Sequence, residues 1–175
     1  VLSSVRRENI QEATSHAHSM VTTPGDAGIY AAESAYLDRF VQFGEAGDRI
    51  ISLSFPTQPD GDSDDAHPLL ARIEEYLAGA RDGFDDVAVG LTVPTDQRNV
   101  LESVQQLPYG EDATVAQIAG MTPELSAEDD DDLITVREAL AANPVPLLVP
   151  DHRVRDGPSG APPPVEQKLR SVEGL

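Results

Sequence analysis

The spacing of apolar residues changes near residue 66, and this change constrains the fold most. Between residues 28 and 55 they form short β-branched and aromatic runs, with a turn at residues 46–48. From residue 67 to 80 they recur three and four positions apart. We predict three short antiparallel strands, then an amphipathic helix whose apolar stripe comprises Leu69, Leu70, Ile73, Tyr76 and Leu77.

The rest of the chain is mainly helical in pattern. Apolar spacing predicts helices over residues 95–107, 114–121, 131–142 and 165–172, a short edge strand over 87–91 and an extended, proline-rich segment over 143–150. Thr95 is the expected N-cap of the first of these helices. The second and third are joined by a turn, which is typical of a helix-turn-helix.

A composition shift at Val93-Pro94 marks the predicted domain boundary. We expect a flexible extension over residues 1–19, an N-terminal α/β domain over 20–92 and a helical domain over 93–175, with Met20 as an alternative first residue. His16 and His18 lie in the extension without a nearby third ligand, so we expect no metal and no cofactor.

The chain is strongly acidic. It has 31 Asp and Glu against 12 Lys and Arg, a formal charge of −19. Its one lysine is Lys168. This pattern is typical of halophilic proteins, whose surfaces stay hydrated in concentrated salt. No stretch approaches the ~20 apolar residues that cross a bilayer, so we expect a cytoplasmic monomer away from membranes. No Cys is present, which excludes thiol chemistry.

Residues 143–154 read Asn-Pro-Val-Pro-Leu-Leu-Val-Pro-Asp-His-Arg-Val. This segment resembles the active-site segment of the methylated-DNA–protein-cysteine methyltransferases at every position but one. The exception is Asp151, which stands where the family has its nucleophilic Cys. Residues 107–111 (Leu-Pro-Tyr-Gly-Glu), Ile118-Ala119 and Glu173-Gly174 extend the resemblance, which covers about residues 28–175.

The resemblance implies an α+β fold and a chemistry. The fold is a small ribonuclease H-like N-terminal domain with an antiparallel sheet, followed by a winged-helix or helix-turn-helix domain that enters the minor groove and flips an alkylated guanine. In the family, a thiolate activated by a neighbouring His and Glu takes the alkyl group. His152 and Glu173 match that pair, whereas the carboxylate of Asp151 is a poor nucleophile toward a methyl carbon. The alternative interpretation of Asp151 is a polar side chain that caps a turn or pairs with Arg153 or His152, and that of His152 is a buried, hydrogen-bonded structural residue.

The resemblance also predicts residues that contact DNA. Val115 stands where the family has a Tyr that crowds the phosphate, and Ile134 stands where it has an Arg that fills the gap left by the flipped base. Arg137 lies one turn beyond Ile134 and is either a displaced substitute or a surface residue. The full predicted set is Tyr109, Val115, Ile134, Arg137, Asn143 and Arg153.

An acidic run, residues 128–132, stands at the N-terminus of the predicted recognition helix. Acidic residues stabilise a helix N-terminus, but they oppose DNA phosphates at contact range. Three functions therefore remain open: an alkyltransferase-like protein that binds double-stranded DNA with alkylated guanine at high salt, a paralogue without DNA binding that acts as an interaction module, and an enzyme that uses Asp151, His152 and Glu173.

Overall fold

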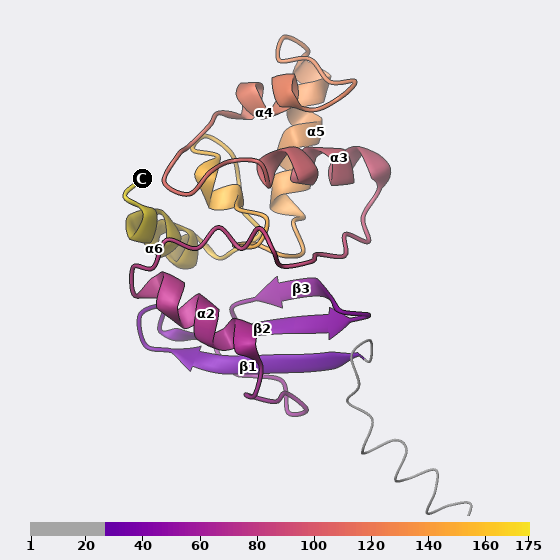
Figure 1. The fold of residues 1–175 in the computed structure, drawn as a ribbon. Coiled ribbons are helices and arrows are strands. Elements are labelled where there is room, and N and C mark those ends of the chain that lie inside the picture. Colours follow the sequence, from indigo (N-terminus) through magenta and orange to yellow (C-terminus); the bar gives the residue numbers. More distant parts are fainter. Residues whose placement is uncertain (1–26) are drawn as a thin grey trace, which may run out of the picture.

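The computed structural model describes residues 27–175 and confirms the predicted α+β class. An antiparallel sheet comes first in the chain and a group of helices follows it (Figure 1). In chain order the elements are β1 (Gly28–Ser34), β2 (Arg39–Ala46), β3 (Arg49–Ser54), α2 (Pro68–Leu77), α3 (Thr95–Val104), α4 (Val115–Met121), α5 (Asp130–Ala141), the 3-10 helix η1 (Asp151–Arg153) and α6 (Pro163–Glu173).

The three strands pair in the order β1-β2-β3, as the alternation of residues 28–55 predicts. The turn between β2 and β3 places Gly47 and Asp48 at positive φ, 59° and 62°. This is the backbone that two-residue hairpins require, and Gly and Asp adopt it readily. The predicted hairpin at residues 46–48 is therefore confirmed.

Helix α2 packs across the sheet and buries all five residues of its predicted stripe. The sequence starts the helix in two ways: Pro68 occupies the first turn, and His67 Nδ1 accepts a hydrogen bond from the Leu69 N–H at 3.0 Å. The His67 ring also lies against Tyr30 and Phe43, with centroids 4.6 and 4.8 Å away. One side chain thus caps the helix and fixes it to β1 and β2.

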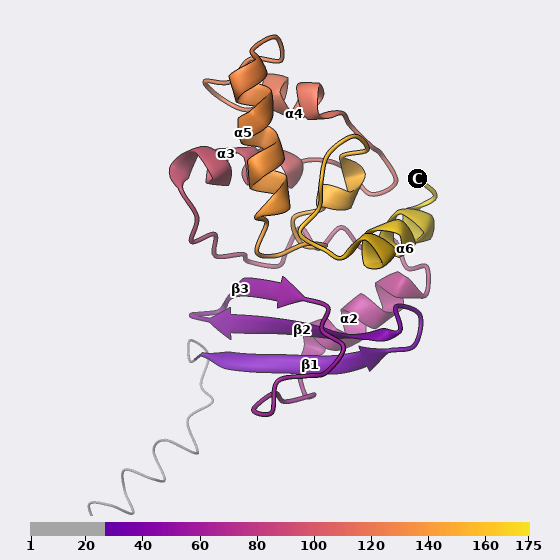
Figure 2. The same ribbon diagram turned by 180° about the vertical axis from the view of Figure 1, so that it is seen from behind.

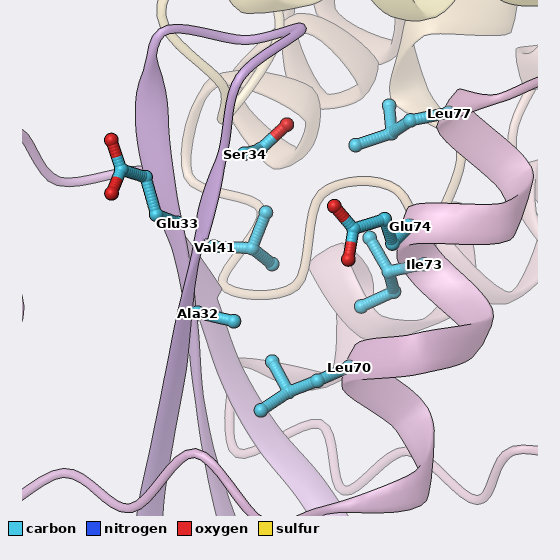
Figure 3. A pocket seen from close by; sticks show the side chains of 8 residues that line it. All are labelled: Ala32, Glu33, Ser34, Val41, Leu70, Ile73, Glu74 and Leu77. Carbon is cyan, nitrogen blue, oxygen red and sulfur yellow. The ribbon is translucent and has the colours of Figure 1, made fainter.

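A small cavity remains between the sheet and α2. In Figure 3, Val41 and Ala32 point from the strands toward Leu70, Ile73 and Leu77 on the helix. The cavity holds about 10 Å³, which is room for one water molecule at most. It is therefore a packing gap and not a site for a nucleobase.

Helices α3, α4 and α5 pack against one another beyond the sheet (Figure 2). The Thr114 hydroxyl accepts from the Gln117 N–H while the Gln117 side chain accepts from the Thr114 N–H, a capping box that starts α4. Asp129 caps α5 by accepting from Asp131 N–H at 2.9 Å. The α4–turn–α5 unit confirms the predicted helix-turn-helix. The wing stays a prediction, since among residues 27–175 no strand follows β3.

Three local predictions differ from the structure. The strand predicted over residues 87–91 is reduced to a single bridge between Val89 and Ile50. Further along the outer edge of β3, the Leu53 N–H donates to the Pro144 carbonyl and is not available to residues 87–91. Thr95 is not the N-cap of α3: Pro94 is, and its carbonyl accepts the first helical bond, from Arg98. Residues 143–150 are not extended but fold into turns.

Helix α6 is fastened to the turn between β1 and β2. Lys168 Nζ donates to the Tyr36 carbonyl at 2.7 Å, and the Tyr36 hydroxyl donates to the Lys168 carbonyl at 3.3 Å. The ammonium also lies 5.6 Å from the Tyr36 ring centroid. The predicted extension, residues 1–19, lies outside the described residues. Within residues 27–175, no helix combines the length and apolar character needed to cross a membrane.

Candidate functional site

The turns of residues 143–150 lead into η1 and bury the Asp151 carboxylate completely. Three groups donate hydrogen bonds to it. The Ser159 hydroxyl donates to Oδ1 at 2.6 Å, whereas the Gly160 N–H and the Asn143 amide donate to Oδ2 at 2.7 and 2.9 Å. The carboxylate therefore fixes the loop after η1 to Asn143 at the end of α5.

Asp151 pairs with neither Arg153 nor His152, but its carboxylate caps the loop that follows η1, so the capping part of the alternative interpretation holds and the pairing part is wrong. Its partners lie on the loop and on Asn143, because its two neighbours in η1, His152 and Arg153, are both bonded to Glu173. Burial raises the pKa of Asp151 above its ordinary value, although the hydrogen bonds from Ser159, Gly160 and Asn143 oppose the rise. The side chain is thus a buried acid held by neutral donors.

The His152 ring is fully buried beside Glu173. Nε2 lies 2.6 Å from Glu173 Oε2 and 3.4 Å from the Tyr76 hydroxyl, and that hydroxyl itself donates to Oε2. Because a carboxylate only accepts, Nε2 carries a hydrogen. Nδ1 is buried and has no partner within residues 27–175, so in the neutral ring it presents a free lone pair. The prediction of a buried, hydrogen-bonded His152 holds for Nε2 alone.

Glu173 is the centre of a buried polar network. Arg153 Nε donates to Oε1 at 2.7 Å and the Gly110 N–H donates to the same oxygen at 2.9 Å, while Arg153 also donates to the Leu107 carbonyl. Burial alone would raise the pKa of Glu173, but the hydrogen bonds from His152 and Arg153 outweigh it and hold that pKa well below its ordinary value. In the same network, burial and then the bond to Glu173 raise the pKa of Tyr76.

The structure brings most of the sequence-predicted residues of this site together. His152, Arg153 and Glu173 are in direct contact, and Asp151 contacts Asn143. Tyr109 lies at the same place: its hydroxyl donates to the Val172 carbonyl and its ring lies 5.9 Å from Tyr76. Three further residues of the site were not predicted, namely Tyr76, Ser159 and Gly160. Tyr76 is predicted as part of an apolar stripe and not as a site residue, because its distance in sequence from Glu173 gives no local signal.

The residues predicted to face DNA divide into two groups. Ile134 and Arg137 lie exposed on α5, and the side chain of Ile134 is 51% exposed. Val115 and Arg153 are buried, at 1% and 3%, and Arg153 is occupied by Glu173. The acidic run lies at the start of α5, where Asp129 is the cap and Asp130 and Asp131 are exposed.

The geometry does not assemble Asp151, His152 and Glu173 into a metal site. Asp151 binds the loop donors, while Glu173 binds the far nitrogen of His152. Among residues 27–175, no group of three or more His, Asp and Glu is placed to hold a metal ion.

Comparison with known proteins adds to this geometry. Residues 95–164 match the family described as "6-O-methylguanine DNA methyltransferase, DNA binding domain". A methylated-DNA–protein-cysteine methyltransferase of Methanopyrus kandleri is 37% identical over 112 residues, which span 61% of this chain and 78% of the relative. That of Metallosphaera sedula is 30% identical over 110 residues, 60% of this chain and 64% of the relative.

Solved structures share the fold. The Mycobacterium tuberculosis O6-methylguanine methyltransferase superposes with a TM-score of 0.67 at 21% identity, covering 85% of this chain and 93% of that one. A second structure of the M. tuberculosis protein, in complex with DNA, gives 0.65 at 20%, covering 84% and 93%. The Pyrococcus kodakaraensis O6-methylguanine-DNA methyltransferase gives 0.60 at 18%, covering 86% and 100%. Taken with the sequence relatives, these matches show that the chain belongs to the DNA-repair family of methylated-DNA–protein-cysteine methyltransferases.

Proposed function

We propose that this protein binds alkylated guanine in double-stranded DNA without transferring the alkyl group to itself. The observation that carries the proposal is the Asp151 carboxylate, which stands at the family's nucleophile position and is buried under three hydrogen-bond donors. We propose further that it acts as a monomer in the cytoplasm, at high salt, with its domains divided at Val93-Pro94.

The chemistry of Asp151 supports recognition without transfer. Displacement at an alkyl carbon needs an exposed nucleophile with a free electron pair in line with the leaving oxygen. Every hydrogen bond from Ser159, Gly160 and Asn143 lowers the nucleophilicity of the carboxylate, and burial favours its protonated, neutral form. His152 is bonded to Glu173 and forms no hydrogen bond to the Asp151 carboxyl, so the His152–Glu173 pair is left with a positioning role.

The helix-turn-helix supports DNA as the partner. In such units the second helix enters a groove, and here that helix is α5. Ile134 on its exposed face is an apolar side chain of the kind that wedges between base steps. Arg137 follows one turn later and supplies a positive charge. The match of residues 95–164 to a DNA-binding domain and the DNA complex of the M. tuberculosis protein agree with this assignment.

The acidic run favours the second candidate, an interaction module that has lost DNA binding. Asp129, Asp130 and Asp131 lie exposed at the end of α5 that would approach phosphates. At about 1 M salt the Debye length is only ~3 Å, so concentrated salt screens these charges except at direct contact. We therefore keep DNA recognition as the first candidate and specify molar salt for its test.

The test compares two duplexes of the same sequence in 1 M KCl by fluorescence anisotropy. One is untreated, and the other is treated with an agent that methylates both guanine O6 and guanine N7, with a radiolabelled methyl group. We expect tighter binding to the methylated duplex, with no label on the protein. Equal binding to both duplexes would favour the interaction module, and label on the polypeptide would refute recognition without transfer.

A further inference from the structure

Residues 158–161, which follow η1 and precede α6, form a short loop that we call the gate loop. Asp151 and His152 are 0% exposed. In the gate loop, Ser159 and Gly160 contact the Asp151 carboxyl, and Ser159 is half-buried while Gly160 is exposed. The loop therefore separates this carboxyl from solvent, and a ligand reaches residue 151 only if the loop moves.

Two hydrogen bonds hold the gate loop, and both end on the same carboxyl. The Ser159 hydroxyl lies 2.6 Å from Asp151 Oδ1, and the Gly160 N–H donates to Oδ2 at 2.7 Å. Within residues 27–175, no other hydrogen bond joins this loop to the rest of the chain, since the Ala161 N–H donates to Ser159 Oγ inside the loop and Pro158 has no N–H. The position of the loop thus depends on the Asp151 side chain.

The chain is anchored on both sides of the gate loop. Before it, Asp156 accepts a hydrogen bond from the Val115 N–H at 2.7 Å, and Gly157 packs so closely that a Cβ there would lie 2.7 Å from Leu140 Cδ1. After it, Pro162 is the N-cap of α6 and its carbonyl accepts the first bonds of that helix. The four residues between these anchors can therefore move without disturbing a helix.

The two bonds to Asp151 do not require an ionised carboxyl. Burial raises the pKa of Asp151, which favours the neutral acid. Oδ2 accepts from both Gly160 and Asn143, so the hydrogen of the neutral acid lies on Oδ1. The Ser159 hydroxyl accepts from that hydrogen, and it donates to the carboxylate when the acid is ionised. In either state Asn143, which lies outside the loop, holds the carboxyl in place after the loop has left.

We propose that the gate loop opens and closes over residue 151 and that Asp151 is the latch that holds it shut. The inference rests on the proposed function and adds the regulation of that site, because a flipped base reaches residue 151 only in the open form. A ligand that binds a minor form has its affinity reduced by the population of that form. The latch therefore slows the association of damaged DNA and weakens its binding.

The first experiment follows the latch in the free protein by hydrogen exchange of single amides. If the gate loop opens locally, exchange of the Gly160 N–H should be insensitive to low concentrations of urea. The Leu53 N–H, which bonds to the Pro144 carbonyl beside the sheet, exchanges when a larger part of the fold unfolds, so its rate should rise with urea. Two different slopes are the expected result.

A variant assigns the latch to its bonds. Ser159→Ala removes one of the two bonds to Asp151 and should speed exchange of the Gly160 N–H about tenfold, which corresponds to about 1.4 kcal/mol. Ser63→Ala is the matched control, because the Ser63 hydroxyl donates to the Asp60 carbonyl at 2.7 Å in a different loop. It should leave the Gly160 rate within about twofold of wild type. Circular dichroism checks that both variants are folded.

The second experiment connects the gate loop to DNA. Association of the methylated duplex in 1 M KCl is followed by stopped-flow anisotropy for wild type and both variants. Since Ser159→Ala increases the open population, it should associate about tenfold faster than wild type, whereas Ser63→Ala should match wild type. The association rate reports the opening, while any contact between Ser159 and the base would change the dissociation rate.

Each outcome decides one part of the inference. A Gly160 exchange rate that rises with urea as steeply as that of Leu53, or that Ser159→Ala leaves unchanged, refutes the latch. Faster exchange in Ser159→Ala without faster association refutes entry of the base through the gate loop. Binding of the methylated duplex no tighter than of the untreated one, in wild type and variant alike, refutes the proposed function, and the exchange rates still decide the latch. If Ser159→Ala does not fold, the urea dependence in wild type decides it.

Discussion

The Tyr76 hydroxyl on α2 donates to the Glu173 carboxylate at the end of α6, so a helix of the N-terminal part completes the buried network around His152. Both residues are buried, Tyr76 completely. Tyr76, on the helix that packs on the sheet, thereby positions the Glu173 carboxylate. That carboxylate determines which nitrogen of His152 carries the hydrogen. The candidate site depends on both halves of the chain.

This relationship predicts the effect of Tyr76→Phe. The substitution keeps the ring and removes one donor to a buried carboxylate, which should lower the free energy of unfolding by about 1–3 kcal/mol. Urea denaturation measures the loss. Tyr36→Phe is the matched control, since the Tyr36 hydroxyl bonds at the surface and its removal should cost less than about 0.5 kcal/mol. Equal losses in both variants would contradict a special role for the Tyr76–Glu173 bond.

The two buried acids predict opposite effects of pH on stability. The pKa of Glu173 is lowered in the fold, so its contribution is present above its ordinary pKa of 4.5 and is lost as the pH falls below that value. The pKa of Asp151 is raised, so its ionised form costs stability, and that cost disappears as the pH falls through the folded pKa toward 3.8. We expect stability to rise on mild acidification and then to fall.

Asp151→Asn identifies the source of the rise. The variant has no acid at this position, so the rise should shrink to the part that Glu166 contributes, since burial raises the pKa of Glu166 as well. The fall below pH 4.5 should remain. Denaturation midpoints in urea at a series of pH values measure both effects. A rise of unchanged size in the variant would assign it to another carboxyl.

Gly160 predicts a test of the loop that Asp151 holds. A Cβ at this position would lie 2.4 Å from the Asn143 carbonyl oxygen, a backbone atom that cannot move aside alone. Gly160→Ala should therefore separate the loop from Asp151 and lower stability by about 1–3 kcal/mol. Gly61→Ala is the control, since nothing lies within 4 Å of its Cβ. Thermal denaturation that shifts equally in both variants would show that the close approach is not essential.

Asp151→Cys tests whether only the nucleophile is missing. The His152–Glu173 pair stays in place, so a thiol beside it should be activated and should accept a methyl group from O6-methylguanine. We expect one labelled methyl per protein, detected by mass spectrometry on the peptide containing residue 151. The double variant with His152→Ala should react more slowly. No methylation of a folded Asp151→Cys protein would show that the surrounding site has diverged as well.

The acidic start of α5 predicts a change in DNA affinity. Asp130→Asn with Asp131→Asn removes two exposed charges and leaves the Asp129 cap intact. If α5 approaches phosphates, binding to undamaged duplex at low salt should tighten, and the difference from wild type should shrink as salt rises. Stability should fall by about 0.3–1 kcal/mol because the helix dipole loses favourable charges. Unchanged affinity at low salt would mean that another surface meets the DNA.

Regular patterns in the sequence predicted most of the fold. The hairpin at Gly47-Asp48, the buried stripe of α2 and the two helices around the turn at 122–130 all follow from local spacing. One failure occurs where distant segments compete for one backbone group. Leu53 bonds to Pro144 and so denies a partner to the predicted strand at 87–91.

The site was only partly predictable, because several of its features depend on contacts between distant residues or on an unusual backbone conformation. The family resemblance named His152 and Glu173, and the structure brings them to 2.6 Å. Leu147, in the same segment, adopts a φ of 80° while buried. That backbone is unfavourable for a bulky residue, so no propensity could have indicated it. Ser159 gives no signal in a loop rich in Gly and Pro until its hydroxyl is seen on Asp151.

Helix α6 acts as a short rigid rod. Lys168 ties it to the turn between β1 and β2, and Glu173 ties it to the buried network five residues later, a separation of about 7–8 Å along the axis. We therefore expect a displacement of the turn at Tyr36 to reach His152 through this helix. Weakening the contacts between Lys168 and Tyr36 should change how precisely the His152 imidazole is held, even though no atom near that ring has been altered.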